Sequence, residues 1–254
     1  MLAARSLIFN LLFYAWTVAL SIAILPVLLM PPRATVAVAR FWARSVAWLA
    51  RVVVGLDWEL RGREHLPDGP FVLAIKHQSA WDTIMYVLMV DEPAIVLKRE
   101  LMWIPLYGWY LNKSGMIPID RGAGGAALRK MLRRCRAALD AGRPIVIAPE
   151  GTRTAPGTSA PYHPGVAALY SHLDVPVVPA ALNAGLYWGR RSFLRRPGRI
   201  TVAFLEPMPA GLDRAAFMAD LKERIETATA ELQQEAGDRD GLAPTLETSR
   251  QESA

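Results

Sequence analysis

The stretch Phe71-Val-Leu-Ala-Ile-Lys-His-Gln-Ser-Ala-Trp-Asp82 decides which fold this chain of 254 residues can adopt. Its first five residues are apolar and follow the turn signal Gly69-Pro70, so they predict a short buried strand. Ser79 is a favoured helix N-cap residue, which places Asp82 at the third helical position. The stretch therefore predicts a strand that leads into a helix, with His77 at the carboxyl end of the strand.

His77 and Asp82 have two interpretations. A carboxylate at the third helical position can reach back toward the segment that precedes the helix. His77 would then be a general base, because its unperturbed pKa lies nearest neutral pH, and Asp82 would fix its tautomer. Alternatively, Ser79 and Asp82 form an ordinary capping box, in which Asp82 only accepts hydrogen bonds from backbone N–H groups, and His77 is a surface residue.

A second apolar strand is predicted at Pro144-Ile-Val-Ile-Ala148, and Pro149-Glu-Gly-Thr-Arg153 follows it. If the two strands are parallel, both polar blocks open onto the same edge of the sheet, where open α/β sheets bind ligands. Arg153 has the planar fork that grips a phosphate, Glu150 can accept hydrogen bonds from a ligand hydroxyl, and Gly151 lets the backbone approach a ligand closely. The alternative is a polar turn with an incidental ion pair.

Two further blocks support a resemblance to a known family. Lys98-Arg-Glu-Leu101 leads to Gly115-Met-Ile-Pro-Ile-Asp-Arg121, and Val175-Pro-Val-Val-Pro-Ala180 comes after the second strand. In this order, over about residues 66–185, the four blocks resemble those of the glycerolipid acyltransferases, in particular the 1-acyl-sn-glycerol-3-phosphate acyltransferases. Lys76 is a departure, since many members have asparagine there.

The resemblance implies that a fatty acyl group moves from acyl-CoA or acyl-carrier protein to the sn-2 hydroxyl of lysophosphatidate, giving phosphatidic acid. His77 would be the base and Asp82 its orienting partner. The acyl donor would be a co-substrate, and no cofactor or metal ion is expected. The residues expected to bind substrate are Arg153 and Arg121 for phosphate, Glu150 for the glycerol part, and also Gly151, Thr152 and Lys98.

Two other functions compete with this one. Acylation of another lyso-lipid, such as a lyso-aminolipid or a lysophospholipid, would use the same two residues. A membrane protein that only binds lipid is a different class, but binding alone needs no base, so the presence of both His77 and Asp82 counts against it.

The composition favours a membrane partner. The formal net charge is +6 and the pI is about 9.7, which suits phospholipid headgroups or nucleic acid. The loop of aromatic residues and arginines at 187–196 fits either partner, and the apolar N-terminus decides against nucleic acid. A single cysteine excludes an intrachain disulfide framework and fits a reducing compartment. The four scattered histidines show no metal-site spacing.

The N-terminal region predicts a membrane anchor. Leu7–Met30 is a run of 24 residues without a charge, and about 20 residues span a bilayer core. Residues 34–54 form an amphipathic helix with arginine and tryptophan, which suits a membrane interface or packing on the globular domain. The two helices could form a hairpin in one leaflet, or one could span. More arginines follow the apolar run than precede it, so we expect an inner-membrane protein whose catalytic domain faces the cytoplasm.

We therefore expect an α/β fold in which helices flank a mixed sheet, with an N-terminal membrane-embedded helical element. Residues 1–54 would be the membrane-anchoring segment, 55–236 the acyltransferase domain, and 237–254 a disordered tail. Within the domain, the helix predicted at 123–141 places Cys135 on its apolar stripe, which indicates a core residue and not a nucleophile.

Overall fold

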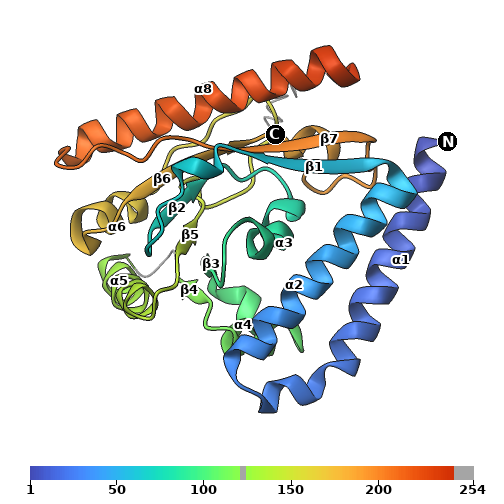
Figure 1. Ribbon diagram of the computed structural model, residues 1–254, viewed down its shortest axis with the longest axis horizontal. Coiled ribbons are helices and arrows are strands. Elements are labelled where there is room, and N and C mark those ends of the chain that lie inside the picture. Colours follow the sequence, from blue (N-terminus) through green and yellow to red (C-terminus); the bar gives the residue numbers. More distant parts are fainter. Residues whose placement is uncertain (121–123, 243–254) are drawn as a thin grey trace, which may run out of the picture.

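A computed structural model describes residues 1–120 and 124–242 of the chain, and it shows a single sheet between two layers of helices (Figure 1). The strands are β1 (Leu56–Arg61), β2 (Val72–Ile75), β3 (Ala94–Lys98), β4 (Ile117–Ile119), β5 (Ile145–Ile147), β6 (Val177–Leu182) and β7 (Gly198–Phe204). The α-helices are α1 (Leu2–Ala23), α2 (Pro32–Leu49), α3 (Ala80–Met89), α4 (Tyr107–Lys113), α5 (Gly124–Asp140), α6 (Gly165–Leu173), α7 (Ala184–Tyr187) and α8 (Arg214–Asp240). Shorter helical turns are η1 (Leu25–Leu29), η2 (Ala50–Val54), η3 (Arg63–His65) and η4 (Arg99–Trp103).

The sheet has seven strands in the order β1-β7-β6-β2-β5-β3-β4. All neighbours are parallel except β6 and β7, which are antiparallel, so the predicted mixed sheet is confirmed. The two strands that precede the polar blocks lie side by side, with Val72 opposite Ile145 in a parallel pair. The blocks that follow β2 and β5 therefore share one edge of the sheet, as the sequence predicted.

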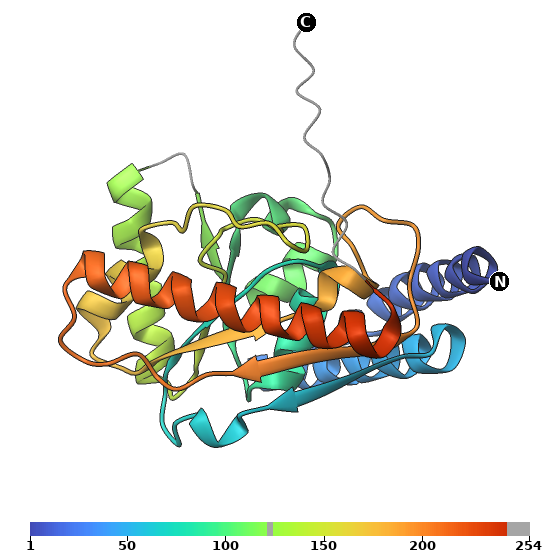
Figure 2. The same cartoon turned by 90° about the horizontal axis from the view of Figure 1, so that it is seen from above.

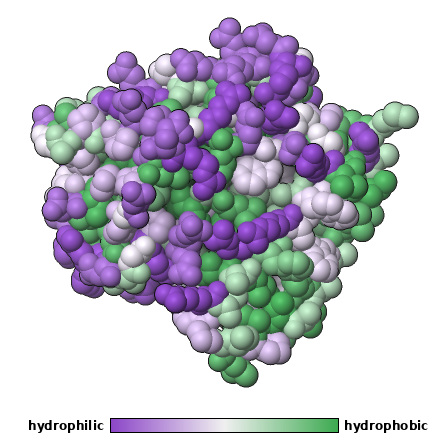
Figure 3. Space-filling view, in the orientation of Figure 1, coloured by the Kyte–Doolittle hydropathy of each residue, from purple (hydrophilic) through white to green (hydrophobic). Residues whose placement is uncertain are grey.

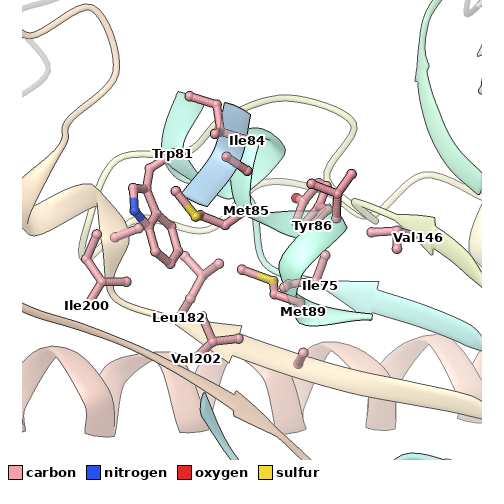
Figure 4. Packing of buried hydrophobic residues seen from close by; sticks show 14 of the residues in the cluster. Ile75, Trp81, Ile84, Met85, Tyr86, Met89, Val146, Leu182, Ile200 and Val202 are labelled. Carbon is pink, nitrogen blue, oxygen red and sulfur yellow. The ribbon is translucent and has the colours of Figure 1, made fainter. Parts of the chain in front are cut away.

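Alternating residues of the buried strands face two separate hydrophobic clusters. Leu73 and Ile75 of β2 contact the cluster around α3, whereas Val72 and Ala74 contact the cluster formed by α5, α6 and α8. Figure 4 shows the first cluster, in which side chains of α3 pack against the central strands. Figure 2 shows α8 lying along the sheet over most of its length. Because both faces of the central strands are covered, their polar ends at the edge of the sheet are the natural place for a site.

The two N-terminal helices have a buried and an exposed side. Phe9, Ala43 and Val46 are fully buried and belong to the same cluster as α3, so the core continues across the expected boundary at residue 54. The other side of α1 exposes apolar residues, and α1 is long and apolar enough to cross a membrane by length and composition. Figure 3 shows apolar side chains gathered over the region of α1, α2 and α4.

The C-terminal prediction needs one correction. We expected residues 237–254 to be disordered, but α8 continues through 237–240 and ends at Gly241, which has the left-handed conformation of a helix C-cap. The Tyr187 hydroxyl donates a hydrogen bond to Asp240, and the guanidinium of Arg239 donates to the carbonyl of Arg199, so tertiary contacts hold the last turn. Residues 243–254 lie outside the described part of the chain.

Candidate active site

His77 and Asp82 form a hydrogen-bonded pair at the carboxyl end of β2. Their Nδ1 and Oδ2 atoms are 3.0 Å apart, and the Asp82 side chain is fully buried while that of His77 is 17% exposed. Because Nδ1 is engaged by a carboxylate, the proton of a neutral imidazole is held on Nδ1, and Nε2 is left to accept a proton. The pair therefore has the geometry of a base and its orienting partner.

Asp82 is a helix cap at the same time. Its Oδ2 atom also accepts hydrogen bonds from the backbone N–H groups of Gln78 and Ser79, both at 2.7 Å. The Ser79 hydroxyl in turn accepts from the N–H of Trp81 at 3.1 Å. The contacts required by both interpretations of this carboxylate are therefore present, because a cap that fixes the first turn of α3 also fixes the position from which Asp82 meets His77.

The second polar block holds the backbone of His77. The N–H of His77 donates to Glu150 Oε2 at 3.0 Å, and the carbonyl oxygen of His77 accepts from the N–H of Thr154 at 2.9 Å. The Thr154 hydroxyl donates to Glu150 Oε1 at 2.9 Å, which ties the two contacts together. Both backbone groups of the candidate base are therefore fixed by the loop that follows β5.

Glu150 lies in a buried ion-pair network and not on the cavity wall. Its side chain is fully buried against Lys76, whose Nζ atom lies 2.7 Å from Oε1, and it does not line the cavity described below. Lys76 also contacts both carboxylate oxygens of Glu226 at 2.8 Å, and Tyr162 donates to Glu226 at 3.0 Å. The contact expected between Glu150 and the glycerol part of a substrate therefore stays a prediction, and the structure shows a positioning contact with the backbone of His77 instead. A buried lysine needs carboxylates close by, and Glu150 is one of the two that it has.

His77 faces a cavity of about 570 Å³ at the carboxyl edge of the sheet. Four of the predicted substrate-binding residues line it, namely Lys98, Gly151, Thr152 and Arg153. Gly151 has a φ of 64°, a backbone conformation that glycine adopts without strain, and this lets the loop turn along the cavity wall. Arg121, the other candidate phosphate ligand, lies outside the described residues.

The rest of the cavity wall is largely apolar. It is formed by side chains of α3, β3, η4, β5, α5 and α6, including Tyr86, Leu97, Leu101, Leu128, Met131 and Val146. The hydroxyl of Tyr86 is buried, and no described residue hydrogen-bonds to it. Burial raises the pKa of this phenol well above its usual value, and the negative charges of Asp82 and Glu150 raise it further. Tyr86 therefore stays neutral and is a potential donor in the cavity wall.

Sequence reasoning missed three of these residues for different reasons. Lys76 was noted only as a departure from the family pattern, because its burial follows from the fold and not from its neighbours in the sequence, and a fully buried lysine is paired. Glu226 carries no local signal, because it is one of many charged residues on α8. Tyr86 has the spacing of a core residue on the apolar face of α3, and only the cavity distinguishes it.

The fold and the site define a class of protein. A histidine that is hydrogen-bonded to a buried carboxylate stands at a largely apolar cavity, beside a loop with a half-buried arginine, and this arrangement suits the transfer of an acyl chain to a hydroxyl. The sequence profile of the Acyltransferase family matches residues 57–183, and the chain belongs to that family.

Its relatives are acyltransferases of lipids. The chain is 36% identical to the 1-acyl-sn-glycerol-3-phosphate acyltransferase of Pseudomonas aeruginosa over 90% of both chains. It is 28% identical to the lyso-ornithine lipid O-acyltransferase of the same organism, over 71% of this chain and 76% of that protein. The crystal structure of the 1-acyl-sn-glycerophosphate acyltransferase PlsC of Thermotoga maritima has the same fold, with a TM-score of 0.73, 21% identity, and coverage of 92% of this chain and 99% of that one.

Proposed function

We propose that this protein transfers a fatty acyl group from an acyl thioester to the sn-2 hydroxyl of 1-acyl-sn-glycerol-3-phosphate, which gives phosphatidic acid for phospholipid synthesis. The observation that carries the proposal is the His77–Asp82 pair at a cavity that also holds Arg153. The pair occurs in a chain that aligns with a 1-acyl-sn-glycerol-3-phosphate acyltransferase of P. aeruginosa over 90% of the length of each protein.

In the proposed reaction, Nε2 of His77 takes the proton of the acceptor hydroxyl as its oxygen attacks the thioester carbonyl. The buried carboxylate of Asp82 stabilises the imidazolium that forms. The tetrahedral intermediate collapses with cleavage of the carbon–sulfur bond, and the imidazolium returns the proton to the leaving thiolate. No covalent enzyme intermediate is needed, because the thioester is already activated.

The two parts of the cavity suit the two parts of the substrates. Arg153 lines the polar part beside His77, and its guanidinium can bind the phosphate of the acceptor through two parallel hydrogen bonds. Lys98, Gly151 and Thr152 line the same cavity and complete the proposed polar site. The apolar wall formed by α3, β3, α5 and α6 can take the acyl chain, whose burial stabilises the complex by about 0.8 kcal/mol per methylene.

We propose that a lipid surface covers one side of the molecule. The exposed apolar residues of α1 and α2 continue into the segment η4–α4, where Trp103, Ile104 and Trp109 are exposed and the Tyr110 hydroxyl donates to the carbonyl of Ser21. Leu101 belongs to this segment and Lys98 directly precedes it, and both line the cavity that His77 faces. The arginines that follow α1 favour an inner-membrane position with the site on the cytoplasmic side.

The test is an acceptor panel with purified protein in detergent micelles. We expect product from lysophosphatidate, and less from lyso-ornithine lipid or from a lysophospholipid whose phosphate is esterified, scored by product mass. His77→Ala should reduce the rate by about 100- to 10,000-fold, the usual cost of losing a general base. His172→Ala replaces an exposed histidine on α6 and should change nothing. Preference for lyso-ornithine lipid would replace the proposed acceptor, and turnover by His77→Ala near the unsubstituted rate would reject the mechanism.

A further inference from the structure

A second cavity, of about 710 Å³, is lined by Ala155 and Pro156, which directly follow the loop that carries Arg153. Its wall combines the 155–156 segment, α7, the loop 189–196 and residues 241–242, which directly follow α8. Arg190, Arg191 and Arg196 line it, and none of the described residues that line it is acidic. We propose that this arginine cavity binds the phosphate groups of the acyl donor, an inference that rests on the acyl-transfer function proposed above.

The charges of the arginine cavity are the first observation. Arg190, Arg191 and Arg196 are exposed, and none forms an ion pair with a carboxylate among residues 1–120 and 124–242. Several other arginines on the surface do have such partners. Three guanidinium groups around one concave surface attract a polyanion, and each can bind a phosphate through two hydrogen bonds.

The loop that presents these arginines is held in place by buried contacts. Arg195 is buried, its guanidinium stacks over Trp188 at 4.5 Å from the ring centre, and burial lowers its pKa to about 10. The backbone N–H of Arg195 donates to the Ser6 hydroxyl at 2.9 Å, which ties the loop to α1. Arg191 has a φ of 55°, a left-handed conformation that costs free energy for a side chain of this size. The fixed loop thus holds a strained residue at the cavity wall.

The arginine cavity is connected to the active site. The guanidinium of Arg190 donates to the backbone carbonyl of Arg153 at 3.2 Å, and Arg153 lines the cavity that His77 faces. Behind them, the N–H of Gly185 donates to Gln78 at 3.1 Å, one residue after His77. A Cβ atom at Gly185 would lie 2.9 Å from Pro156, so α7 and the 155–156 segment, which both line the arginine cavity, are in close contact. A ligand in the arginine cavity is therefore next to the loop that lines the reaction site.

The chemistry of the reaction assigns the ligand. In the function proposed above, Arg153 in the first cavity binds the phosphate of the lyso-lipid acceptor. The acyl donor must bring its thioester to His77 while its carrier stays outside. Coenzyme A carries a pyrophosphate and a 3′-phosphate at the far end of a pantetheine arm, and an acyl carrier carries one phosphodiester there. The shared feature is a phosphate separated from the thioester by a flexible linker, which fits a basic cavity adjoining the reaction site.

The first test is direct binding, which requires no turnover. Arg191→Gln combined with Arg196→Gln removes two charges and leaves Arg190, whose contact with Arg153 could affect the acceptor site. We expect the double variant to bind free coenzyme A about tenfold or more weakly, by calorimetry at low salt, because charge-assisted hydrogen bonds are lost. Arg133→Gln combined with Arg134→Gln removes two exposed charges from α5 and should leave the affinity unchanged. Equal coenzyme A affinity in the double variant and the unsubstituted protein would overturn the inference.

The second test uses three donors with the same acyl chain, namely acyl-CoA, acyl-phosphopantetheine and acyl-pantetheine. The double variant should lose kcat/KM about tenfold or more with acyl-CoA, less with acyl-phosphopantetheine, and nothing with acyl-pantetheine. An equal loss with all three donors would show a structural effect and reject a phosphate site. A change confined to the KM of the acceptor in anionic vesicles would assign the arginines to lipid headgroups instead. If the unsubstituted protein binds coenzyme A but does not acylate lysophosphatidate, the proposed function fails while the arginine cavity stands.

Discussion

The carboxylate of Glu150 accepts a hydrogen bond from the backbone N–H of His77 at 3.0 Å, so the second polar block positions the first. The same carboxylate lies against the buried amine of Lys76, whose other carboxylate partner is Glu226 on α8. The position of the candidate base thus depends on a buried ion-pair network that reaches across the sheet. Such a network fixes geometry more than it adds stability, since burying its charges costs desolvation free energy that their mutual attraction largely offsets.

Glu150→Gln tests this positioning role. The amide keeps the size of the side chain and one acceptor oxygen, but it loses the charge beside Lys76. Its NH₂ group, which is a donor, also faces one of the groups that now donate to the carboxylate. We expect kcat to fall by about tenfold or more, because the histidine backbone is no longer held in place, while the KM for lysophosphatidate changes little. A large rise in that KM with unchanged kcat would restore the direct contact between Glu150 and the substrate.

The Asp82→Asn variant distinguishes the two roles of Asp82, as a helix cap and as the orienting partner of His77. The amide oxygen can still accept from backbone N–H groups, but the negative charge that stabilises a protonated His77 is gone, so we expect the rate to fall by at least about 100-fold. Asp213 provides a matched control, because it caps α8 by accepting from the N–H of Ala216 at 2.8 Å and has no place at the site. Asp213→Ala should lower the free energy of unfolding by about 1 kcal/mol with unchanged kcat. Unchanged turnover by Asp82→Asn would leave Asp82 as a cap alone.

Trp109→Glu tests whether the segment η4–α4 meets the lipid surface together with α1. Trp109 is 53% exposed, and replacing an interfacial aromatic ring by a charge should weaken binding to anionic vesicles by about tenfold or more. The measurement is co-sedimentation with vesicles at high salt. Gln234→Glu adds the same charge at an exposed position of α8 and should have a much smaller effect. Equal binding by both variants would confine the lipid contact to α1 and α2.

Cys135 offers a pH-dependent probe. It is the only cysteine, it is fully buried, and burial raises the pKa of its thiol to about 12, against about 8.5 in an unfolded chain. Its contribution to stability is therefore complete below pH of about 8.5 and is lost as the pH rises toward 12. We expect negligible alkylation of the native protein at pH 8 and rapid alkylation in denaturant. Fast labelling of the native protein would show that α5 opens readily.

Local sequence pattern predicted the parts of the site that lie within one segment. The strand before His77, the cap at Ser79 and the reach of Asp82 depend on neighbouring residues, and the structure confirms all three. The shared edge of β2 and β5 followed from treating both as buried parallel strands, and the structure confirms this as well.

Contacts between distant segments could not be predicted in the same way. Lys76 meets Glu226 only because α8 returns over the sheet, and no spacing in the sequence encodes that return. The buried contact between Glu150 and Lys76 was missed for the same reason, since a carboxylate beside a turn glycine suggests a ligand contact until the buried lysine is seen. Likewise, residues 187–196 were noted as a loop of aromatic residues and arginines that suits a membrane interface or nucleic acid, but only the fold brings Arg190 to the carbonyl of Arg153.

The pairing of β1 with β7 has a consequence for how the protein is made. β1 directly follows the N-terminal helices, yet among the strands of residues 1–120 and 124–242 its only neighbour is β7, and the N–H of Gly198 donates to the carbonyl of Gly55 where the pair begins. During synthesis, the apolar helices therefore leave the ribosome long before the strand that completes their edge of the sheet. Pairings this remote in sequence form late, and an unpaired strand invites aggregation. Early contact between the helices and a bilayer would keep the growing chain at a membrane while the rest of the domain is still being synthesised, so the lipid surface proposed above would also serve as a folding environment for this enzyme.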